Sequence, residues 1–332
     1  MPSLEYLITC LVVVLIPGAG VIYTVSTALV HGRRAGILAA LACTLGILPH
    51  LLATILGVAA ILHSSALVFE TLRYAGAAWG NGELALLNEY WWRTRQIREW
   101  RLAPDGDRAP QLIREGSYED RYADPGSPVM VPDANGFSRL LVGADGNSIY
   151  RIGEGASPEG DRPFLDRQSL ADGRSERLFH SSAPWYEMPR ALLDDNATRI
   201  LTTREAPTEP ANFFVRTLAN ASAEPVALTA FEHPTPQLRD VQKELVRFKR
   251  KDGVDLTGTL YLPGGYDAAR DGPLPMLMWA YPGEFKSADA ASQVTDSPYR
   301  FNAVGFWGPQ AFLAMGYAVF ADVSMPIIGE GT

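Results

Sequence analysis

Apolar residues dominate the first 78 positions of the chain, and a mixture of apolar and charged residues follows. Two apolar runs, about 7–30 and 36–62, are long enough to cross a hydrocarbon core of about 30 Å as helices. A third apolar segment, 66–78, contains Glu70 and Arg73 and is too short to span unaided. The pattern predicts two transmembrane helices and an incomplete third.

Three residues, Pro17, Gly18 and Gly20, interrupt the first apolar run. Such a break is either a tolerated kink in a membrane helix or a place where free backbone groups line a transport path. The residues alone favour the kink.

A short loop with Arg33 and Arg34 separates the two long runs. Short basic loops stay on the cytoplasmic side of a membrane. The pattern therefore predicts a multi-pass protein of the inner or plasma membrane, with the lipid bilayer as a partner. If the third segment does not cross, the residues that follow it lie on the outer, periplasmic side.

The composition changes abruptly within residues 73–92. Charges, prolines and aromatic residues become frequent after residue 78, and no Ser/Pro-rich spacer marks the change. We divide the chain into a membrane part, residues 1–78, and two further bodies, residues 79–240 and 241–332.

Residues 79–240 have the pattern of short β-strands separated by tight turns. Asn135-Gly136, Asp145-Gly146 and Asp172-Gly173 favour such turns, because glycine accepts a positive φ and Asn or Asp tolerates it. Many short strands at this spacing are typical of a sandwich, barrel or propeller, and the recurring strand pairs favour a partial β-propeller. The expected strands are 84–92, 97–102, 139–142, 148–152, 164–166, 177–179, 199–203, 213–217 and 226–230.

Residues 241–332 begin with a predicted hairpin, 243–249 and 255–262. A continuous apolar run at 275–280 predicts a strand buried on both faces. A helix at 311–315 and a second buried strand at 317–323 follow. This order is how an α/β-hydrolase sheet begins. The expected fold class is mixed: N-terminal transmembrane helices, then a partial β-propeller, then the first strands of an α/β-hydrolase domain.

The net charge of the chain is −8, and residues 1–78 carry three arginines against two glutamates, which leaves −9 for the remainder. Nucleic acid is therefore excluded as a partner, because phosphate binding needs clustered Lys and Arg. Both cysteines, Cys10 and Cys43, lie in apolar stretches and are explained as small core residues.

We expect no metal and no cofactor. The glycine-rich loop 153–160 lacks the lysine and the strand–loop–helix setting of a phosphate loop. Scattered surface carboxylates are a better interpretation than a cation site for Glu115, Glu119, Asp120 and Asp124.

The first 78 residues resemble the N-terminus of the LysE/RhtB amino-acid exporter family in the segments 15–36, 40–50 and 66–79. The family has Pro-Gly-Pro where this chain has Pro17, Gly18 and Ala19. It also has more membrane segments than the two and a fraction found here. The resemblance therefore does not imply transport by this part alone.

Residues 79–332 resemble the prolyl oligopeptidase family, specifically its glutamyl endopeptidase branch. In such enzymes a serine on a strand–helix turn attacks the peptide carbonyl, and a His and an Asp from later loops assist it. The resemblance implies peptides as the substrate class. The segments that carry it are 88–102, 117–130, 153–167, 208–214, 233–239, 251–267, 279–301 and 324–331.

The sequence contains no Gly-x-Ser-x-Gly, and the triad residues that the family implies would all follow Thr332. By the same resemblance, Tyr281 stands where the family has a tyrosine whose hydroxyl stabilises the oxyanion. On the residues alone, an aromatic side chain packed at a strand end is an equal interpretation.

We therefore expect a truncated glutamyl-endopeptidase-like serine peptidase fused to an exporter-like membrane segment, inactive alone because the triad is missing. One alternative is a membrane-tethered protein-binding module that associates through open propeller edges. A second alternative is a remnant of a LysE-type amino-acid exporter.

Overall fold

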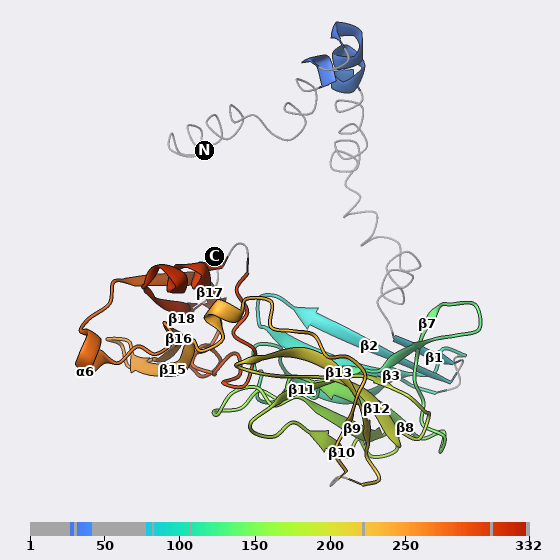
Figure 1. The fold of residues 1–332 in the computed structure, drawn as a ribbon. Coiled ribbons are helices and arrows are strands. Elements are labelled where there is room, and N and C mark those ends of the chain that lie inside the picture. Colours follow the sequence, from blue (N-terminus) through green and yellow to red (C-terminus); the bar gives the residue numbers. More distant parts are fainter. Residues whose placement is uncertain are drawn as a thin grey trace. The chain divides into compact units, whose positions relative to one another are not determined.

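The protein is described from a computed structural model, which describes residues 27–29, 32–41, 78–81, 83–105, 108–220, 223–305 and 308–329. The chain divides into two compact units, residues 1–75 and 76–332. Most of the structured residues described in the second unit are in β-strands, and its helices are few and short (Figure 1).

In the first unit, a short helix covers residues 33–41 and helical residues 27–29 precede it. Gly32 lies between them with a φ of 85°. Gly36 approaches Ala28 so closely that a Cβ on Gly36 would lie 2.4 Å from the Ala28 Cβ.

The predicted fold class is therefore wrong in its N-terminal transmembrane helices. Among the residues that the structure describes, no helix is long and apolar enough to cross a membrane. The described fold is instead mostly β-sheet. Most of the predicted runs 7–30, 36–62 and 66–78 falls outside the described residues, namely 7–26, 30, 42–62 and 66–77. The predicted break residues Pro17, Gly18 and Gly20 also fall outside them.

Three four-stranded antiparallel sheets and one two-stranded sheet follow in the second unit. The first sheet contains β1 (Ala78–Asn81), β2 (Leu84–Trp91), β3 (Gln96–Leu102) and β4 (Gln111–Ser117). The second contains β10 (Ser175–His180), β9 (Phe164–Ser169), β8 (Ser148–Gly153) and β5 (Ser127–Pro128). The third contains β11 (Tyr186–Leu192), β12 (Arg199–Ala206), β13 (Glu209–Thr217) and β14 (Val226–Ala227), and β6 (Met130–Pro132) pairs with β7 (Ser138–Leu140).

The predicted strands of this region are confirmed, with boundaries shifted by a few residues. The turns at Gly136, Gly146 and Gly173 have positive φ, as their sequence pairs predicted. Five strands were not predicted, namely β1, β4, β5, β6 and β11. In β11, Pro189 interrupts the pattern. A register shift falls between Pro189 and Ala191, and β11 lies at the edge of its sheet, where proline is tolerated. The arrangement of the sheets as a propeller stays a prediction, as do the boundaries at 78 and 240.

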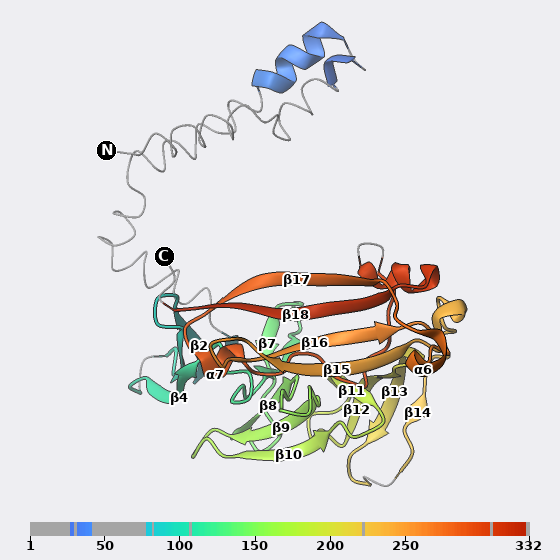
Figure 2. The ribbon, with the colours of Figure 1, turned by 90° about the vertical axis from the view of Figure 1, so that its left-hand side faces the viewer.

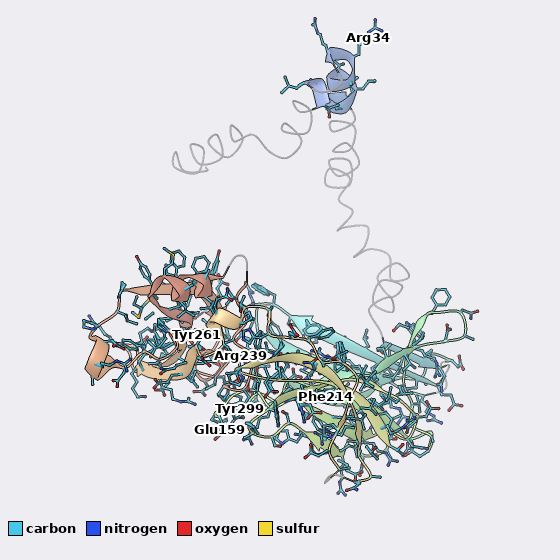
Figure 3. The ribbon with its side chains drawn as sticks, in the orientation of Figure 1. Arg34, Glu159, Phe214, Arg239, Tyr261 and Tyr299 are labelled. Carbon is cyan, nitrogen blue, oxygen red and sulfur yellow. The ribbon has the colours of Figure 1, made fainter. Side chains whose placement is uncertain are left out.

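Apolar side chains from neighbouring sheets form the core of this region. One cluster joins the first sheet to the second: Leu84, Leu86, Leu140, Ile149 and Leu170. Another joins the second sheet to the third: Leu141, Tyr150, Leu165, Ala197 and Ile200. Figure 3 shows how densely side chains fill the space around these sheets, with Phe214 on β13 among them.

One ion pair is buried in this core. Arg151 on β8 donates from Nη2 to Glu99 on β3 at 2.6 Å, and the two side chains are 2% and 4% exposed. Its Nε donates to Gln168 on β9 at 2.7 Å, and its Nη1 donates to the Gly126 carbonyl at 3.1 Å. Each guanidinium nitrogen therefore has a partner, which burial of this cation requires.

A mixed sheet in the order β15-β16-β18-β17 completes the unit. Figure 2 shows its four long strands side by side. The predicted hairpin is confirmed, since β15 (Gln242–Lys249) pairs antiparallel with β16 (Asp255–Leu262). Strand β17 (Met276–Phe285) runs parallel to β18 (Ala318–Ile328). The connection between them contains α7 (Ala288–Ala291) and the 3₁₀ helix η2 (Pro309–Met315), and the remaining short helices are η1 (Pro236–Leu238) and α6 (Ala268–Asp271).

Two predictions for this sheet need correction. The segment predicted as a helix at 311–315 is 3₁₀, and it ends at Gly316 with a φ of 82°. The strand predicted as buried on both faces is instead the edge strand β17, whose Met276, Met278 and Trp279 are about half exposed. By contrast, Val319 and Ala321 on the neighbouring β18 are buried as predicted.

Candidate functional site

Tyr281 lies on the edge strand β17, opposite Ser324 of β18. Its side chain is 79% exposed and lines a cavity of about 310 Å³. The cavity has apolar walls from β17, β18 and α7, among them Trp279, Phe285 and Met325. We call it the Tyr281 cavity. Both the predicted role of Tyr281 in oxyanion binding and the alternative of an aromatic side chain packed at a strand end stay predictions.

Arg121 enters the Tyr281 cavity from the loop that follows β4 (Gln111–Ser117). Its Nη1 donates to the Val294 carbonyl at 3.0 Å, and its Nη2 donates to the Asp161 carboxylate at 3.1 Å. Its backbone N–H donates to Gln293 Oε1 at 2.8 Å. The arginine is therefore fixed by residues from the second antiparallel sheet and from the β17–β18 connection.

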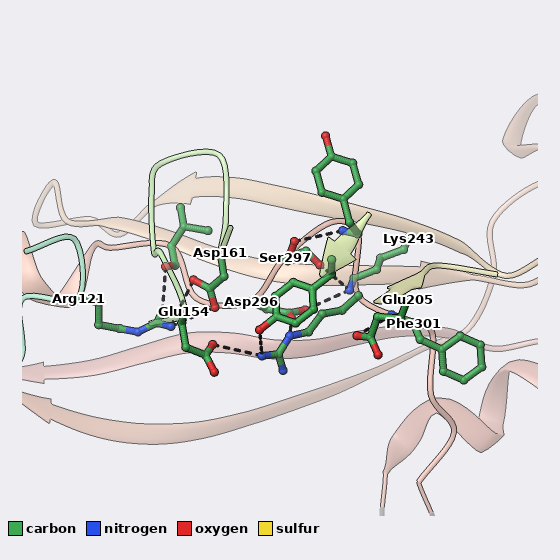
Figure 4. Close-up of polar contacts among 12 residues, drawn as sticks. Arg121, Glu154, Asp161, Glu205, Lys243, Asp296, Ser297 and Phe301 are labelled. Carbon is green, nitrogen blue, oxygen red and sulfur yellow. Dashed lines mark hydrogen bonds and ion pairs between the residues drawn. The ribbon is translucent and has the colours of Figure 1, made fainter. Parts of the chain in front are cut away.

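A second, polar cavity of about 630 Å³ adjoins the first, and Arg121, Thr295 and Asp322 line both. Figure 4 shows ion pairs and hydrogen bonds among the residues that line it and their neighbours. Lys243 on β15 lies 3.1 Å from Asp296 and donates to the Ser297 carbonyl at 2.9 Å. We call this the polar cavity.

Arg300 organises the other side of the polar cavity. Its Nη2 donates to the Tyr186 hydroxyl at 2.7 Å and lies 3.2 Å from Glu154. Glu154 comes from the glycine-rich loop 153–160. Gly155 in that loop has a φ of 64°, and a Cβ on it would lie 1.9 Å from the Arg162 carbonyl oxygen. Glycine is thus required where the loop turns to present Glu154.

Burial shifts several pKa values in the polar cavity. It raises the pKa of Asp161 to about 6, although the positive charge of Arg121 acts in the opposite direction. Burial also raises the pKa of Tyr186 to about 12. The pKa of Asp322 is raised first by burial and then by the nearby Asp296. The cavity therefore combines fixed cations with carboxylates whose charged forms are disfavoured.

The carboxylates in and after β4 make specific contacts. Glu115 pairs with Arg98 at 2.9 Å, and Glu119 pairs with Arg95 at 2.8 Å. Glu119 also accepts the Lys286 backbone N–H at 2.9 Å. Among the residues that the structure describes, no group of His, Cys, Asp and Glu side chains is arranged to hold a metal ion.

The residues of the polar cavity were not predicted from the sequence. Arg121, Asp161 and Asp296 each lie inside a segment that carried the family resemblance, namely 117–130, 153–167 and 279–301. That membership was the only signal available. The contacts join residues 40 and 173 positions apart, which no local pattern reveals.

Two curated relatives match most of the chain. A probable chloroplastic glutamyl endopeptidase of Oryza sativa subsp. japonica is 42% identical over 273 residues, which is 78% of this chain and 29% of the relative. Most of this chain is homologous to glutamyl endopeptidases. The corresponding Arabidopsis thaliana protein is 40% identical over 274 residues, 78% of this chain and 28% of the relative. The chain thus spans less than a third of the length of these glutamyl endopeptidases.

The N-terminal residues match another family. The LysE type translocator family matches residues 11–79. An uncharacterized membrane protein of Vibrio cholerae is 33% identical over 116 residues, which is 35% of this chain and 48% of that protein.

Solved structures of peptidases are similar to the chain at low identity. The apo AtxE2 isopeptidase is 14% identical with a TM-score of 0.42, and the match covers 74% of this chain and 32% of that chain. Dipeptidyl peptidase 4 of Porphyromonas gingivalis is 18% identical with a TM-score of 0.42, and the match covers 74% and 37%.

The predicted multi-pass membrane localisation, with the later residues on the periplasmic side, needs correction. Both glutamyl endopeptidase relatives are named as chloroplastic. Within the described ranges, no helix could span a bilayer.

Proposed function

We propose that residues 79–332 are part of a serine peptidase that cleaves peptides after glutamate. The observation that carries the proposal is the 42% identity to a glutamyl endopeptidase over 273 residues, which is 78% of this chain. Peptide hydrolysis through an acyl-enzyme needs a nucleophile, a base and donors for the oxyanion.

Tyr281 is the donor that these residues contribute. Its hydroxyl belongs to an exposed side chain on a strand, at the wall of a cavity with apolar sides. A phenol held on a strand donates a hydrogen bond to a developing oxyanion without reorganisation of the site.

The 332 residues alone have no peptidase activity in this proposal. They contain no Gly-x-Ser-x-Gly, and an oxyanion donor without a nucleophile performs no acyl transfer. The nucleophile and its base come from a further segment that packs beside the exposed face of β17.

Complementation tests this proposal. The full chain is produced alone and together with the segment of the rice relative that follows the matched residues, and both samples receive fluorogenic peptides that differ only in Glu or Gln at the cleaved position. The combined sample should cleave after Glu and lose this activity with a serine-directed inhibitor, while the full chain alone should cleave neither peptide. Cleavage by the chain alone would contradict its inactivity, and an inactive complex in which the two segments co-purify would contradict the peptidase function.

A further inference from the structure

Arg121 has the chemistry to bind an acidic side chain, because a guanidinium pairs with a carboxylate. It lines the Tyr281 cavity and also the polar cavity beside it. Among the described residues that line the Tyr281 cavity, it is the sole cation, and Asp322 is the sole carboxylate. Burial and Asp296 raise the pKa of Asp322, which disfavours a competing negative charge there.

The guanidinium is held in place before any ligand arrives. Val294 and Asp161 accept hydrogen bonds from Nη1 and Nη2, and the Asp161 side chain is itself 2% exposed (Figure 4). The Asp161 backbone N–H donates to the Asp296 carbonyl at 2.9 Å, which fixes the carboxylate in turn. A prepositioned arginine loses little conformational entropy when it binds an anion.

Part of this guanidinium remains available. An arginine has five N–H donors, while the contacts above use Nη1 and Nη2 only. The side chain is 33% exposed and lines the Tyr281 cavity, so part of it is open to a ligand there. The nearby walls from Trp279, Phe285 and Met325 are apolar and suit the methylene groups of a glutamate side chain.

We propose that Arg121 binds the carboxylate of the substrate glutamate in the Tyr281 cavity and so determines the preference for glutamate over glutamine. The assignment rests on the proposed peptidase function. It gives the side chain of the cleaved residue one charge-assisted contact. Arg121 and Tyr281 line the same cavity.

A binding measurement tests the carboxylate site without activity. Acetyl-glutamate amide and acetyl-glutamine amide are titrated into the full chain and followed by NMR. The wild-type chain should bind the glutamate probe about tenfold more tightly, because a charged partner strengthens the hydrogen bonds of a guanidinium. Arg121→Met should reduce the difference to within about twofold, and Arg121→Lys should be intermediate because it keeps the charge without the planar fork.

Arg98→Met is the matched control. Arg98 is 35% exposed and pairs with Glu115 at 2.9 Å, so it resembles Arg121 in exposure and partner but lines neither cavity. This variant should keep the wild-type preference for the glutamate probe. Equal binding of both probes by the wild type, or an unchanged preference in Arg121→Met, would overturn the inference.

Cleavage by the complemented peptidase separates this inference from the proposed function. Arg121→Met should lower the ratio of kcat/KM for Glu over Gln peptides by roughly 10–100-fold, as expected for loss of a specific polar contact. A complemented wild type that cleaves after Glu and keeps its preference in Arg121→Met overturns only the role of Arg121. Arg121-dependent binding of the glutamate probe without any cleavage overturns the peptidase function and leaves the carboxylate site standing.

Discussion

Two arginine–carboxylate pairs in this protein have the same chemistry and different surroundings. Arg151 and Glu99 lie in the core between the first two sheets, where both side chains are almost fully buried. Arg121 and Asp161 lie at the edge of two cavities, where the carboxylate is buried and the arginine is one third exposed. The first arginine has a protein partner for each nitrogen, and the second keeps donors free. An arginine that can bind a ligand differs from a structural one in having unused N–H donors beside a cavity. The presence of an ion pair does not separate the two kinds.

The largest expected effect comes from breaking the buried pair. Arg151→Met leaves the Glu99 carboxylate without its partner in the core, and we expect the free energy of unfolding to fall by about 3–5 kcal/mol. Urea unfolding of the full chain measures this loss. The double variant Arg151→Met/Glu99→Gln should recover part of it, and a loss below about 1 kcal/mol would show that the two arginines are not structurally different.

Tyr281→Phe tests whether the Tyr281 hydroxyl acts in the reaction. Removal of one oxyanion donor should lower kcat of the complemented peptidase by about 100-fold with little change in KM. Because the side chain is mostly exposed, the urea midpoint of the full chain should stay unchanged. An unaltered kcat would leave Tyr281 without a role in the reaction.

The pH dependence of stability tests the surroundings of Asp161, the carboxylate at the polar cavity. The pKa of Asp161 is raised from 3.8 to about 6 in the folded protein. Between these values the folded chain binds more protons than the unfolded chain, so this group's contribution to stability is complete below pH 4 and is lost as the pH rises to about 6. Taken in full, the difference between 3.8 and about 6 corresponds to about 3 kcal/mol. We expect about 1–2 kcal/mol of it, because solvent screens the partly exposed Arg121 beside this carboxylate. Urea midpoints from pH 4 to 7 should fall more steeply for the wild type than for Asp161→Asn, and parallel profiles would contradict the raised pKa.

The smallest effect is expected for the exposed pair of Arg98 and Glu115. Arg98→Met should change the free energy of unfolding by less than about 1 kcal/mol, because both side chains are solvated. The same urea assay provides the measurement. A loss as large as that of Arg151→Met would show that burial does not decide how strongly an ion pair stabilises this protein.

Local sequence patterns predicted strands well and burial less well. Strand β16 and its hairpin partner follow their alternation closely, whereas β11 was hidden by Pro189. An apolar run predicted burial for β17, yet the strand lies at a sheet edge, and position in a sheet is decided by distant segments. Hydropathy predicted membrane helices, which are not found among the residues that the structure describes.

The candidate site was only partly accessible from the sequence. Tyr281 was predicted because a long family motif surrounds it. It lines a cavity, and its role in oxyanion binding stays a prediction. Arg121 was not found, because its importance depends on Asp161 and Val294, which are remote in the chain. Such contacts depend on how the sheets pack, and no periodicity encodes them.

The contacts of Arg151 have a consequence for how the protein opens. This one side chain binds β3 in the first sheet, β9 in the second and the chain just before β5. Separating the first two sheets would leave a charged group on each side without its partner. The two sheets should therefore unfold as one cooperative unit, and their central amide hydrogens should exchange with solvent at similar rates.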